Sequence, residues 1–362
     1  MLRKFPRPIK RVVVKVGSSV IATYKLKPRT AHLRSIVGQI CEAMRNDVEV
    51  ILVSSGAIVL GLGELGLRTR PSDLASLQAI AAIGQTILMR IYTDFFKKNK
   101  SKCGQVLLTW DDFDNRVRYT NASNTFQAML EKGIVPIVNE NDTISTEEIK
   151  FGDNDKLSAL VASSVRADLL LILSDVEGLY DTSSADKKIF EEVKEITQEI
   201  EEVASGTTKK IMSRGGMTAK LAAIKIATHA QVPCVIAHGE AKNVLARVLN
   251  GERVGTFFME KEEKLLARKH WIFFGVKPKG ILFVDEGAKN ALLKGGRSLL
   301  LPGVVSWEGH FKKNDVVIVK DARHQEIARG ISNYSISDLH QIEEKKGKPE
   351  VIHCDDLVLS ER

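Results

Sequence analysis

Several apolar stretches of the sequence contain or precede residues that can hold an anion. Lys15 lies inside the stretch at residues 11–16, and Gly17 follows it. A lysine inside a buried strand is costly without an anionic partner, whereas a lysine on an edge strand can reach water. Further along, RGGMTAK at residues 214–220 places two glycines and Lys220 at the start of a helical pattern. Backbone N–H groups at a helix start, together with a lysine, form a phosphate cradle.

Carboxylate and amide side chains form a second group, between the two lysines in the sequence. NEND at residues 139–142 follows one apolar stretch, and GDND at residues 152–155 precedes another. Ser55 and Ser174 end two further strand-like stretches. Two lysines with carboxylates between them fit phosphoryl transfer without a P-loop, because lysines neutralise charge on the moving phosphoryl group. The sequence therefore indicates a site for phosphate and a polar substrate.

The elements that position these residues follow from an alternating strand and helix pattern. Continuous Val, Ile and Leu runs separated by helices predict an α/β fold with an open, mostly parallel sheet sandwiched by helices. In such a sheet the carboxyl ends of the strands meet at the ligand crevice, so the polar residues above converge there. We expect strands near residues 11–19, 48–56, 104–110, 134–140, 168–175 and 232–239, and helices near 30–44, 73–98, 121–133, 154–167 and 216–231.

One glycine motif resembles a dinucleotide-binding fingerprint only in its spacing. GLGELG at residues 61–66 matches GxGxxG, but a dinucleotide fingerprint needs these glycines directly after a strand, and the strand here ends at Ser55. We expect a flexible loop at these glycines. The sequence also contains no Walker A loop, GxSxG elbow or HExxH pair.

The composition changes near residue 258. We predict a catalytic domain at residues 1–258, a charged linker at 259–276 and a small β-rich domain with one short helix at 277–362. Most of the net charge of +8 lies in the first part: residues 1–276 have 39 Lys and Arg against 32 Asp and Glu (+7), and the remainder has 14 against 13 (+1). A basic catalytic domain suits an acidic or phosphorylated small substrate as well as a polynucleotide.

Other classes of protein are disfavoured by the sequence. The four cysteines lie far apart, which argues against a disulfide framework or a zinc knuckle. The N-terminal residues lack the apolar core of a signal peptide, and there is no run of about 18 apolar residues. We therefore expect a cytoplasmic protein with no membrane span.

The motifs as a set resemble the amino acid kinase family. The matching segments include VVKVGSS, VSSGAIVLG, IVPIVNENDT, EIKFGDNDKLSALVA, LLLILSDVEGLYD and GGMTAKLAAIKIA, in order over roughly residues 10–258. The tail, with VDEGAKNALLKGGRSLLLPGVV and ARGISNY, resembles a PUA domain, a pseudobarrel. This domain order is similar to that of the family members that phosphorylate glutamate. The resemblance implies transfer of the ATP γ-phosphoryl group to the side-chain carboxylate of L-glutamate, which gives L-glutamate 5-phosphate for proline biosynthesis.

The resemblance also implies roles for individual residues. Lys15 and Lys220 stabilise the moving phosphoryl group, and Asp155 holds both lysines in place. Arg214 stands where a smaller residue is usual, and its side chain either contacts phosphate or points outward. The implied substrate-binding residues are Ser55, Asp142 and Asn154, with Asn139 and Asp153 as helpers. The implied nucleotide-binding residues are Lys15, Gly17, Ser174, Asp175, Arg214, Gly215, Gly216, Met217, Thr218, Ala219 and Lys220.

The implied cofactors are ATP and Mg²⁺, with no metal ligand assigned to the protein. A homo-oligomer and feedback inhibition by proline are expected from the family. Two alternatives stay open: a sister kinase that uses another acid such as aspartate, and an RNA-binding protein, since PUA domains often have that role. The near-neutral tail and the lack of aromatic-rich RNA-binding motifs argue against RNA.

Overall fold

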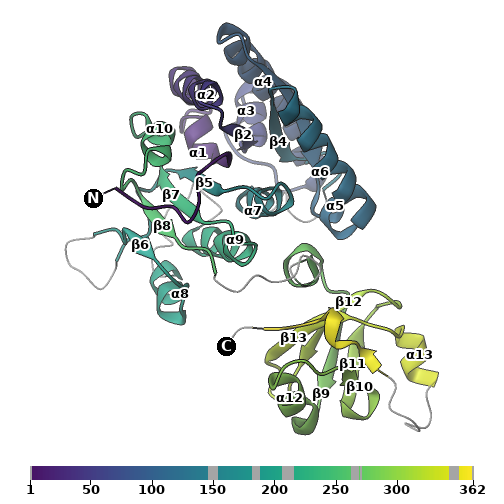
Figure 1. Ribbon diagram of the computed structural model, residues 1–362. Coiled ribbons are helices and arrows are strands. Elements are labelled where there is room, and N and C mark those ends of the chain that lie inside the picture. The colour runs from purple at the N-terminus through teal and green to yellow at the C-terminus, as the bar shows by residue number, and fades with distance from the viewer. Residues whose placement is uncertain are drawn as a thin grey trace. The chain divides into compact units, whose positions relative to one another are not determined.

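The computed structural model describes residues 2–145, 154–181, 188–205, 216–261, 269, 271–341 and 350–360. The chain divides into two compact units, Met1–Lys264 and Leu265–Arg362. Figure 1 shows the helices and strands of both units.

An eight-stranded sheet forms the centre of the N-terminal unit, in the order β3-β4-β2-β1-β5-β7-β8-β6. All pairs from β3 to β7 are parallel, and β8 is antiparallel to β7 at one side. The predicted mostly parallel sheet is therefore confirmed. The strands are β1 (Arg11–Val16), β2 (Glu49–Ser54), β3 (Lys102–Leu108), β4 (Ile134–Glu140), β5 (Leu169–Ser174), β6 (Glu192–Val193), β7 (Cys234–His238) and β8 (Thr256–Phe258).

Helices cover both faces of this sheet (Figure 1). Val12, Val14 and Val16 of β1 enter a core that includes α2 and α4 side chains. Successive side chains of a strand point to opposite faces, so Lys15 faces the other side, where α7 packs on β1 and against α9. The helices are α1 (Ser18–Ile21), α2 (Thr30–Arg45), α3 (Ala57–Glu64), α4 (Leu74–Lys98), α5 (Trp110–Asp114), α6 (Arg116–Glu131), α7 (Asp155–Ser164), α8 (Gln198–Ser205), α9 (Met217–His229) and α10 (Val244–Leu249).

The prediction of a flexible loop at GLGELG is wrong, because Gly61 and Gly63 lie inside α3. The glycines permit a close helix crossing. A Cβ on Gly61 would lie 2.0 Å from the carbonyl oxygen of Ile80, and a Cβ on Gly84 of α4 would lie 1.7 Å from that of Ala57. The low helix propensity of glycine is outweighed here by tertiary packing.

Helix α4 is the one described helix that is long and apolar enough to cross a membrane, by length and composition. In its most apolar 18-residue window, 28% is buried. Its buried side packs on α3 through Leu77 and Ile80 and in the main core through Leu88 and Phe96. A single such helix is weak evidence for a span, because core helices have the same composition.

Arg3 ties the start of the chain to residues near the end of the N-terminal unit. Its backbone N–H donates to Gly251 O at 2.5 Å, and its guanidinium donates to Val254 O and Gly255 O, each at 3.3 Å. Burial lowers the pKa of Arg3 to about 10. We call this group of contacts the Arg3 clasp.

The C-terminal unit is β-rich, as predicted. One sheet has the order β11-β9-β12-β13-β15, and β10 pairs with β14. Leu282, Val317 and Ala328 lie in its core. The strands are β9 (Gly280–Val284), β10 (Leu299–Leu300), β11 (Val304–Gly309), β12 (Val316–Lys320), β13 (Glu326–Ile331), β14 (Glu350–Ile352) and β15 (Leu357–Leu359).

This unit contains a further α-helix besides the single short helix that we predicted. α12 (Glu286–Leu293) corresponds to that prediction, and α13 (Ile336–Gln341) was missed. The π-helical turn η2 (Trp271–Gly275) falls in the predicted linker, and Ile272 packs there with Val316 and Val358 of the same unit. The assignment of residues 259–276 as a linker stays a prediction.

Candidate active site

Three buried charged side chains meet on one side of the central sheet. An ion pair joins Lys15 Nζ to Asp155 Oδ1, and Lys220 Nζ lies 3.2 Å from Asp155 Oδ2. The exposed fractions are only 2%, 1% and 5% for Lys15, Asp155 and Lys220. The edge-strand alternative for Lys15 is wrong, because β1 lies between β2 and β5. We call these three residues the triad.

The local structure explains how residues so far apart in sequence come together. Asp155 is the first residue of α7, where the positive end of the helix dipole favours a carboxylate. Lys220 lies in the first turn of α9, which packs against α7. The triad therefore holds two ammonium groups on a shared carboxylate, close to the start of two helices.

A chain of amide hydrogen bonds lies beside the triad, at the ends of β2 and β4. Asn154 Nδ2 donates to Ser54 O at 2.9 Å and to Asn139 Oδ1 at 2.6 Å. The backbone N–H of Glu140 donates to the same Asn139 oxygen at 2.9 Å. Asn139 and Asn154, predicted to bind the acid substrate, are thus brought into direct contact, and Asn154 immediately precedes Asp155.

The other predicted substrate-binding residues differ in their surroundings. Ser55 is buried, and its Oγ has no hydrogen-bond partner among the described residues. Asp142 is half-buried in the turn after β4, where Ser145 N donates to Asn141 O at 3.1 Å. Asp153 lies outside the described residues.

The described nucleotide-binding residues that we predicted lie at the ends of β1 and β5 and in the first turn of α9. Gly17 N donates to Leu173 O at 3.1 Å, which joins the ends of β1 and β5. A Cβ on Gly17 would lie 3.8 Å from Lys15 Nζ, so the glycine keeps the approach to that ammonium open. At the end of β5, Ser174 Oγ donates to Asp175 at 3.1 Å.

The glycine segment before α9 is only partly described. Gly216 is the N-cap of α9, and Met217, Thr218 and Ala219 form the first turn with Lys220. The N–H groups of Ala219 and Lys220 donate to Gly216 O, so Met217 and Thr218 are the residues of this turn whose N–H groups can donate to an anion. Arg214 and Gly215 lie outside the described residues.

Sequence reasoning missed three polar residues of α4 that contact the site. Gln78 donates to Ser145 O at 3.2 Å, Asn139 donates to Gln85 Oε1 at 2.7 Å, and Tyr92 Oη lies 2.8 Å from Ser54 Oγ. Burial raises the pKa of Tyr92, so the phenol stays protonated and can donate to Ser54. The signal was available, because the three residues are spaced by seven and lie on one side of the helix. We call them the α4 stripe.

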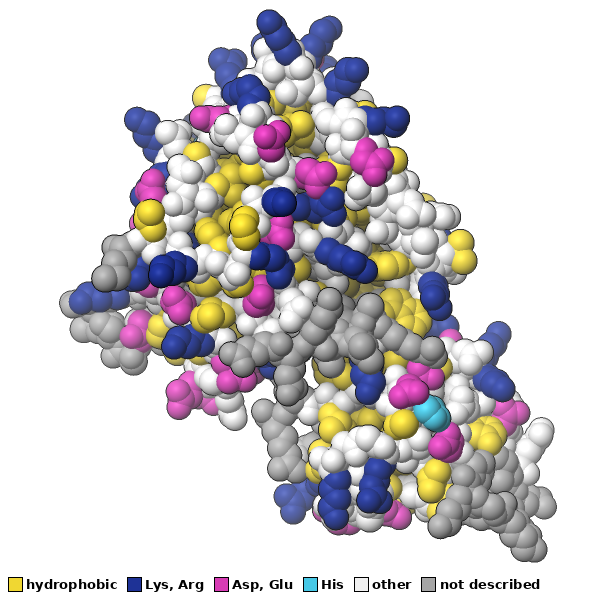
Figure 2. Space-filling model, in the orientation of Figure 1, with side chains coloured by type: hydrophobic (Ala, Val, Ile, Leu, Met, Phe, Trp, Pro, Cys, Tyr) yellow, Lys and Arg dark blue, Asp and Glu magenta, His cyan; other side chains and the backbone are white. Residues whose placement is uncertain are grey.

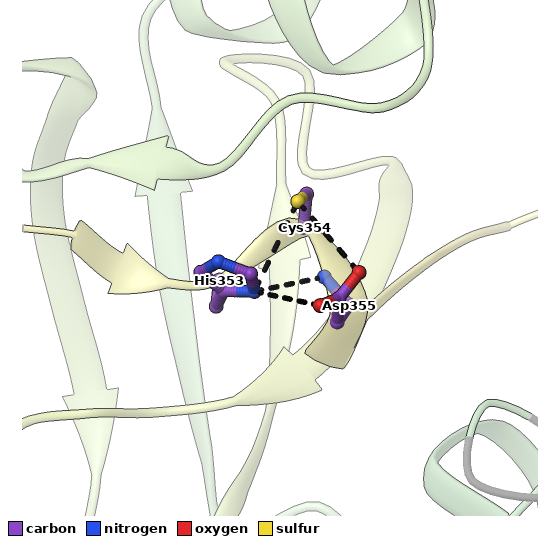
Figure 3. A group of neighbouring side chains, drawn as sticks. All are labelled: His353, Cys354 and Asp355. Atoms are coloured by element: carbon purple, nitrogen blue, oxygen red, sulfur yellow. Dashed lines mark hydrogen bonds and ion pairs between the residues drawn. The ribbon is translucent and has the colours of Figure 1, made fainter.

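In the described part of the chain, one group of side chains has the spacing of a metal site, and it lies in the C-terminal unit (Figure 3). It consists of His353, Cys354 and Asp355 in a turn after β14. His353 Nδ1 already accepts a hydrogen bond from Asp355 N at 3.2 Å and caps the turn. Local capping therefore accounts for this group.

The surface charges are mixed on the face shown in Figure 2. Acidic side chains lie among the basic ones over the N-terminal unit, with hydrophobic side chains between them. On this face the net charge of +8 is not gathered into a single basic patch.

Comparison with known proteins agrees with this architecture. The amino acid kinase family matches residues 10–238, and the PUA domain matches residues 280–353. The chain is 45% identical to the glutamate 5-kinase of Dictyoglomus turgidum over 368 residues, which cover 98% of each chain. It is 44% identical to the glutamate 5-kinase of Caldanaerobacter subterraneus subsp. tengcongensis, over 97% of this chain and 98% of that protein. It is 42% identical to that of Carboxydothermus hydrogenoformans, over 99% and 100%. The chain therefore belongs to the amino acid kinase family and, within it, to the glutamate 5-kinases.

Proposed function

We propose that this protein transfers the γ-phosphoryl group of ATP to the side-chain carboxylate of L-glutamate. The observation that carries the proposal is the triad, in which Lys15 and Lys220 share the carboxylate of Asp155 inside a buried site. Fixed ammonium groups stabilise charge on a moving phosphoryl group most strongly where water is excluded. Full-length similarity to glutamate 5-kinases supplies the identity of the acceptor.

The chemistry requires no proton transfer by the protein. The glutamate side chain is ionised at neutral pH, so a carboxylate oxygen attacks the γ-phosphorus directly. The new O–P bond forms as the bond to the bridging oxygen of ADP breaks, and ADP leaves with that electron pair. Lys15 and Lys220 contact the transferred group, and Asp155 orients both lysines. The site thus needs positioning and charge rather than a general base.

The amide chain supplies the acid-binding side of the site. Asn154 and Asn139 lie next to the triad, and the buried hydroxyl of Ser55, which has no hydrogen-bond partner among the described residues, can bind a substrate oxygen. We assign Ser55, Asp142 and Asn154 to glutamate, with Asn139 as support and Asp153 as a further helper.

The nucleotide side comprises Gly17, Ser174, Asp175 and the residues from Arg214 to Lys220. The described part of this set fits a polyphosphate, because it offers ammonium groups and first-turn N–H groups rather than a cluster of carboxylates. Mg²⁺ accompanies the ATP phosphates and neutralises part of their charge. In this proposal no protein side chain is a metal ligand.

The test is a hydroxylamine-trapping assay with ATP and Mg²⁺. Glutamate, aspartate and acetylglutamate are compared as acceptors, and the acyl phosphate is trapped as a hydroxamate. We expect hydroxamate with glutamate and a much smaller kcat/KM with the other two acids. Preferred use of aspartate or acetylglutamate would show that the protein is a kinase of that acid rather than of glutamate. No acid-dependent turnover with any of the three would overturn the proposal.

The family membership carries further proposals. We infer a cytoplasmic homo-oligomer that is inhibited by proline, with a PUA domain that does not make the protein an RNA-binding factor. Sedimentation, proline titration of the assay and filter binding of tRNA at moderate salt test these points separately. Tight, salt-sensitive tRNA binding would favour the nucleic-acid alternative.

A further inference from the structure

The α4 stripe joins one helix to three parts of the acid-binding side. Gln78, Gln85 and Tyr92 contact, respectively, the turn after β4, the end of β4 and the end of β2. Residues seven apart on a helix lie about 10.5 Å apart along its axis. The helix therefore contacts the acid-binding side at three successive points.

The hydrogen bonds fix the orientation of every amide in this chain. Ser54 O only accepts, so it fixes the Nδ2 side of Asn154. Asn139 Oδ1 accepts from two donors, Asn154 Nδ2 and Glu140 N. The Nδ2 of Asn139 consequently faces Gln85, which must present its Oε1.

This orientation leaves Gln85 Nε2 as a spare donor. The atom is buried and has no hydrogen-bond partner among the described residues. The Oγ of Ser55, next to the carbonyl group that begins the amide chain, is a second buried atom in the same condition. An unsatisfied buried donor is costly, and two of them on one side of a site favour a ligand rich in acceptors.

We propose that Gln85 is a further substrate-binding residue, whose Nε2 donates a hydrogen bond to a carboxylate oxygen of the acid substrate. This inference rests on the proposed glutamate kinase activity. The carboxylate has only acceptors to offer, which matches the donors of Gln85 and Ser55. In the same arrangement Tyr92 is a positioning residue, because its hydroxyl contacts Ser54 Oγ, whereas Gln78 only donates to the backbone oxygen of Ser145.

The test compares Gln85→Glu and Gln85→Met with Gln78→Met in the full chain. Gln85→Glu keeps an acceptor for Asn139 and replaces the donor by an oxygen that repels the substrate carboxylate. Gln85→Met adds no charge and removes both the donor and the oxygen that accepts from Asn139, and it serves if the first variant fails to fold. We expect both to raise the KM for glutamate about 10- to 100-fold, the loss typical of a hydrogen bond to a charged group, with the KM for ATP nearly unchanged.

Gln78→Met is the matched control. This substitution removes the hydrogen bond from α4 to Ser145 O, but it does not remove an unsatisfied donor. The KM of this variant for glutamate should therefore change less than about threefold. An equal rise in Gln78→Met and Gln85→Met would show that Gln85 acts only as a support and would overturn the inference. Wild-type KM for glutamate in the Gln85 variants would overturn it while leaving the proposed function intact. A wild-type protein without glutamate-dependent hydroxamate formation would overturn both.

Discussion

The Nζ of Lys220 lies 3.2 Å from the carboxylate of Asp155, although the two residues lie in the first turns of different helices. The same carboxylate pairs with Lys15 of the central strand β1. A single acid thus fixes both lysines, which separate segments of the chain supply. Each lysine can be removed without leaving Asp155 unpaired.

Replacing either lysine by methionine should lower kcat by a factor of about 10²–10³, because a charge-stabilising donor in a buried site is lost. Lys15→Met and Lys220→Met should still fold, since Asp155 keeps the other lysine as a partner. Steady-state kinetics and circular dichroism measure the two effects. Wild-type kcat in either folded variant would remove that lysine from the mechanism.

Asp142→Ala and Asn154→Ala should instead raise the KM for glutamate far more than the KM for ATP. We expect a change of about 10- to 100-fold, because each removes a polar partner from the acid-binding side. Kinetics with each substrate varied in turn provide the measurement. Equal rises for both substrates would mean that the acid and nucleotide sides are assigned wrongly.

Gly84→Ala should destabilise the protein by about 1–3 kcal/mol or more, because the new methyl group would meet the backbone carbonyl of Ala57. Gly38→Ala is the matched control. Gly38 also lies inside a helix, α2, and a Cβ there meets nothing within 4 Å, so a gain of about 0.5–1 kcal/mol is expected. Urea denaturation of both full-length variants distinguishes the two signs. Equal stabilities would contradict the close crossing of α3 and α4.

Strong periodic patterns made most of the N-terminal fold predictable. The amphipathic pattern of α2 and the continuous apolar runs of β1 and β5 agree with the structure. Helix α3 was missed because glycine favours loops locally, and only the approach of α4 explains Gly61. The spacing of seven along α4 could have pointed to Gln85, but its contact with Asn139, which is 54 residues away, depends on the tertiary fold and is not shown by that spacing. The pairing of Asp155 with both lysines followed from family resemblance rather than from spacing.

The C-terminal unit should lose stability in acid through Asp321. This carboxylate accepts a hydrogen bond from Lys289 Nζ at 2.8 Å, and further ones from Gln325 N and Arg323 N. The Lys289 bond is the main cause that holds the pKa of Asp321 below its ordinary value of 3.8. A carboxyl group with a lowered pKa stabilises the folded state above its unfolded pKa, and this contribution disappears as the pH falls through the folded pKa.

Asp321→Asn should therefore be less stable than the parent at neutral pH, and the difference should shrink below the ordinary pKa of the carboxyl group. Urea midpoints at several pH values measure it. A Trp110→Phe background leaves Trp271 and Trp307 as fluorescence reporters of the C-terminal unit. A difference that stays constant down to the most acidic pH would contradict the role of the ionised carboxylate.

A fragment that ends after Lys261 should fold and phosphorylate glutamate. Every residue with an assigned chemical role lies at or before Lys220, and the backbone N–H of Lys261 donates to Thr228 O at 3.1 Å within the N-terminal unit. We expect kcat within about threefold of the full chain, because independent domains keep their own cores. A soluble, folded fragment without glutamate-dependent turnover would show that the C-terminal unit completes the site.

The Arg3 clasp has a consequence for the order in which the molecule is made. The backbone N–H of Arg3 donates to Gly251 O. This hydrogen bond therefore cannot form until almost all of the N-terminal unit has been synthesised. On a ribosome that emits about 5–20 residues per second, the N-terminal segment therefore spends on the order of ten seconds or longer outside the ribosome before its partners exist. Contacts of such long sequence separation fold slowly. By the time the clasp closes, Lys15, Asp155 and Lys220 have all been synthesised, so closure of the clasp can serve as a late marker of a completed active domain.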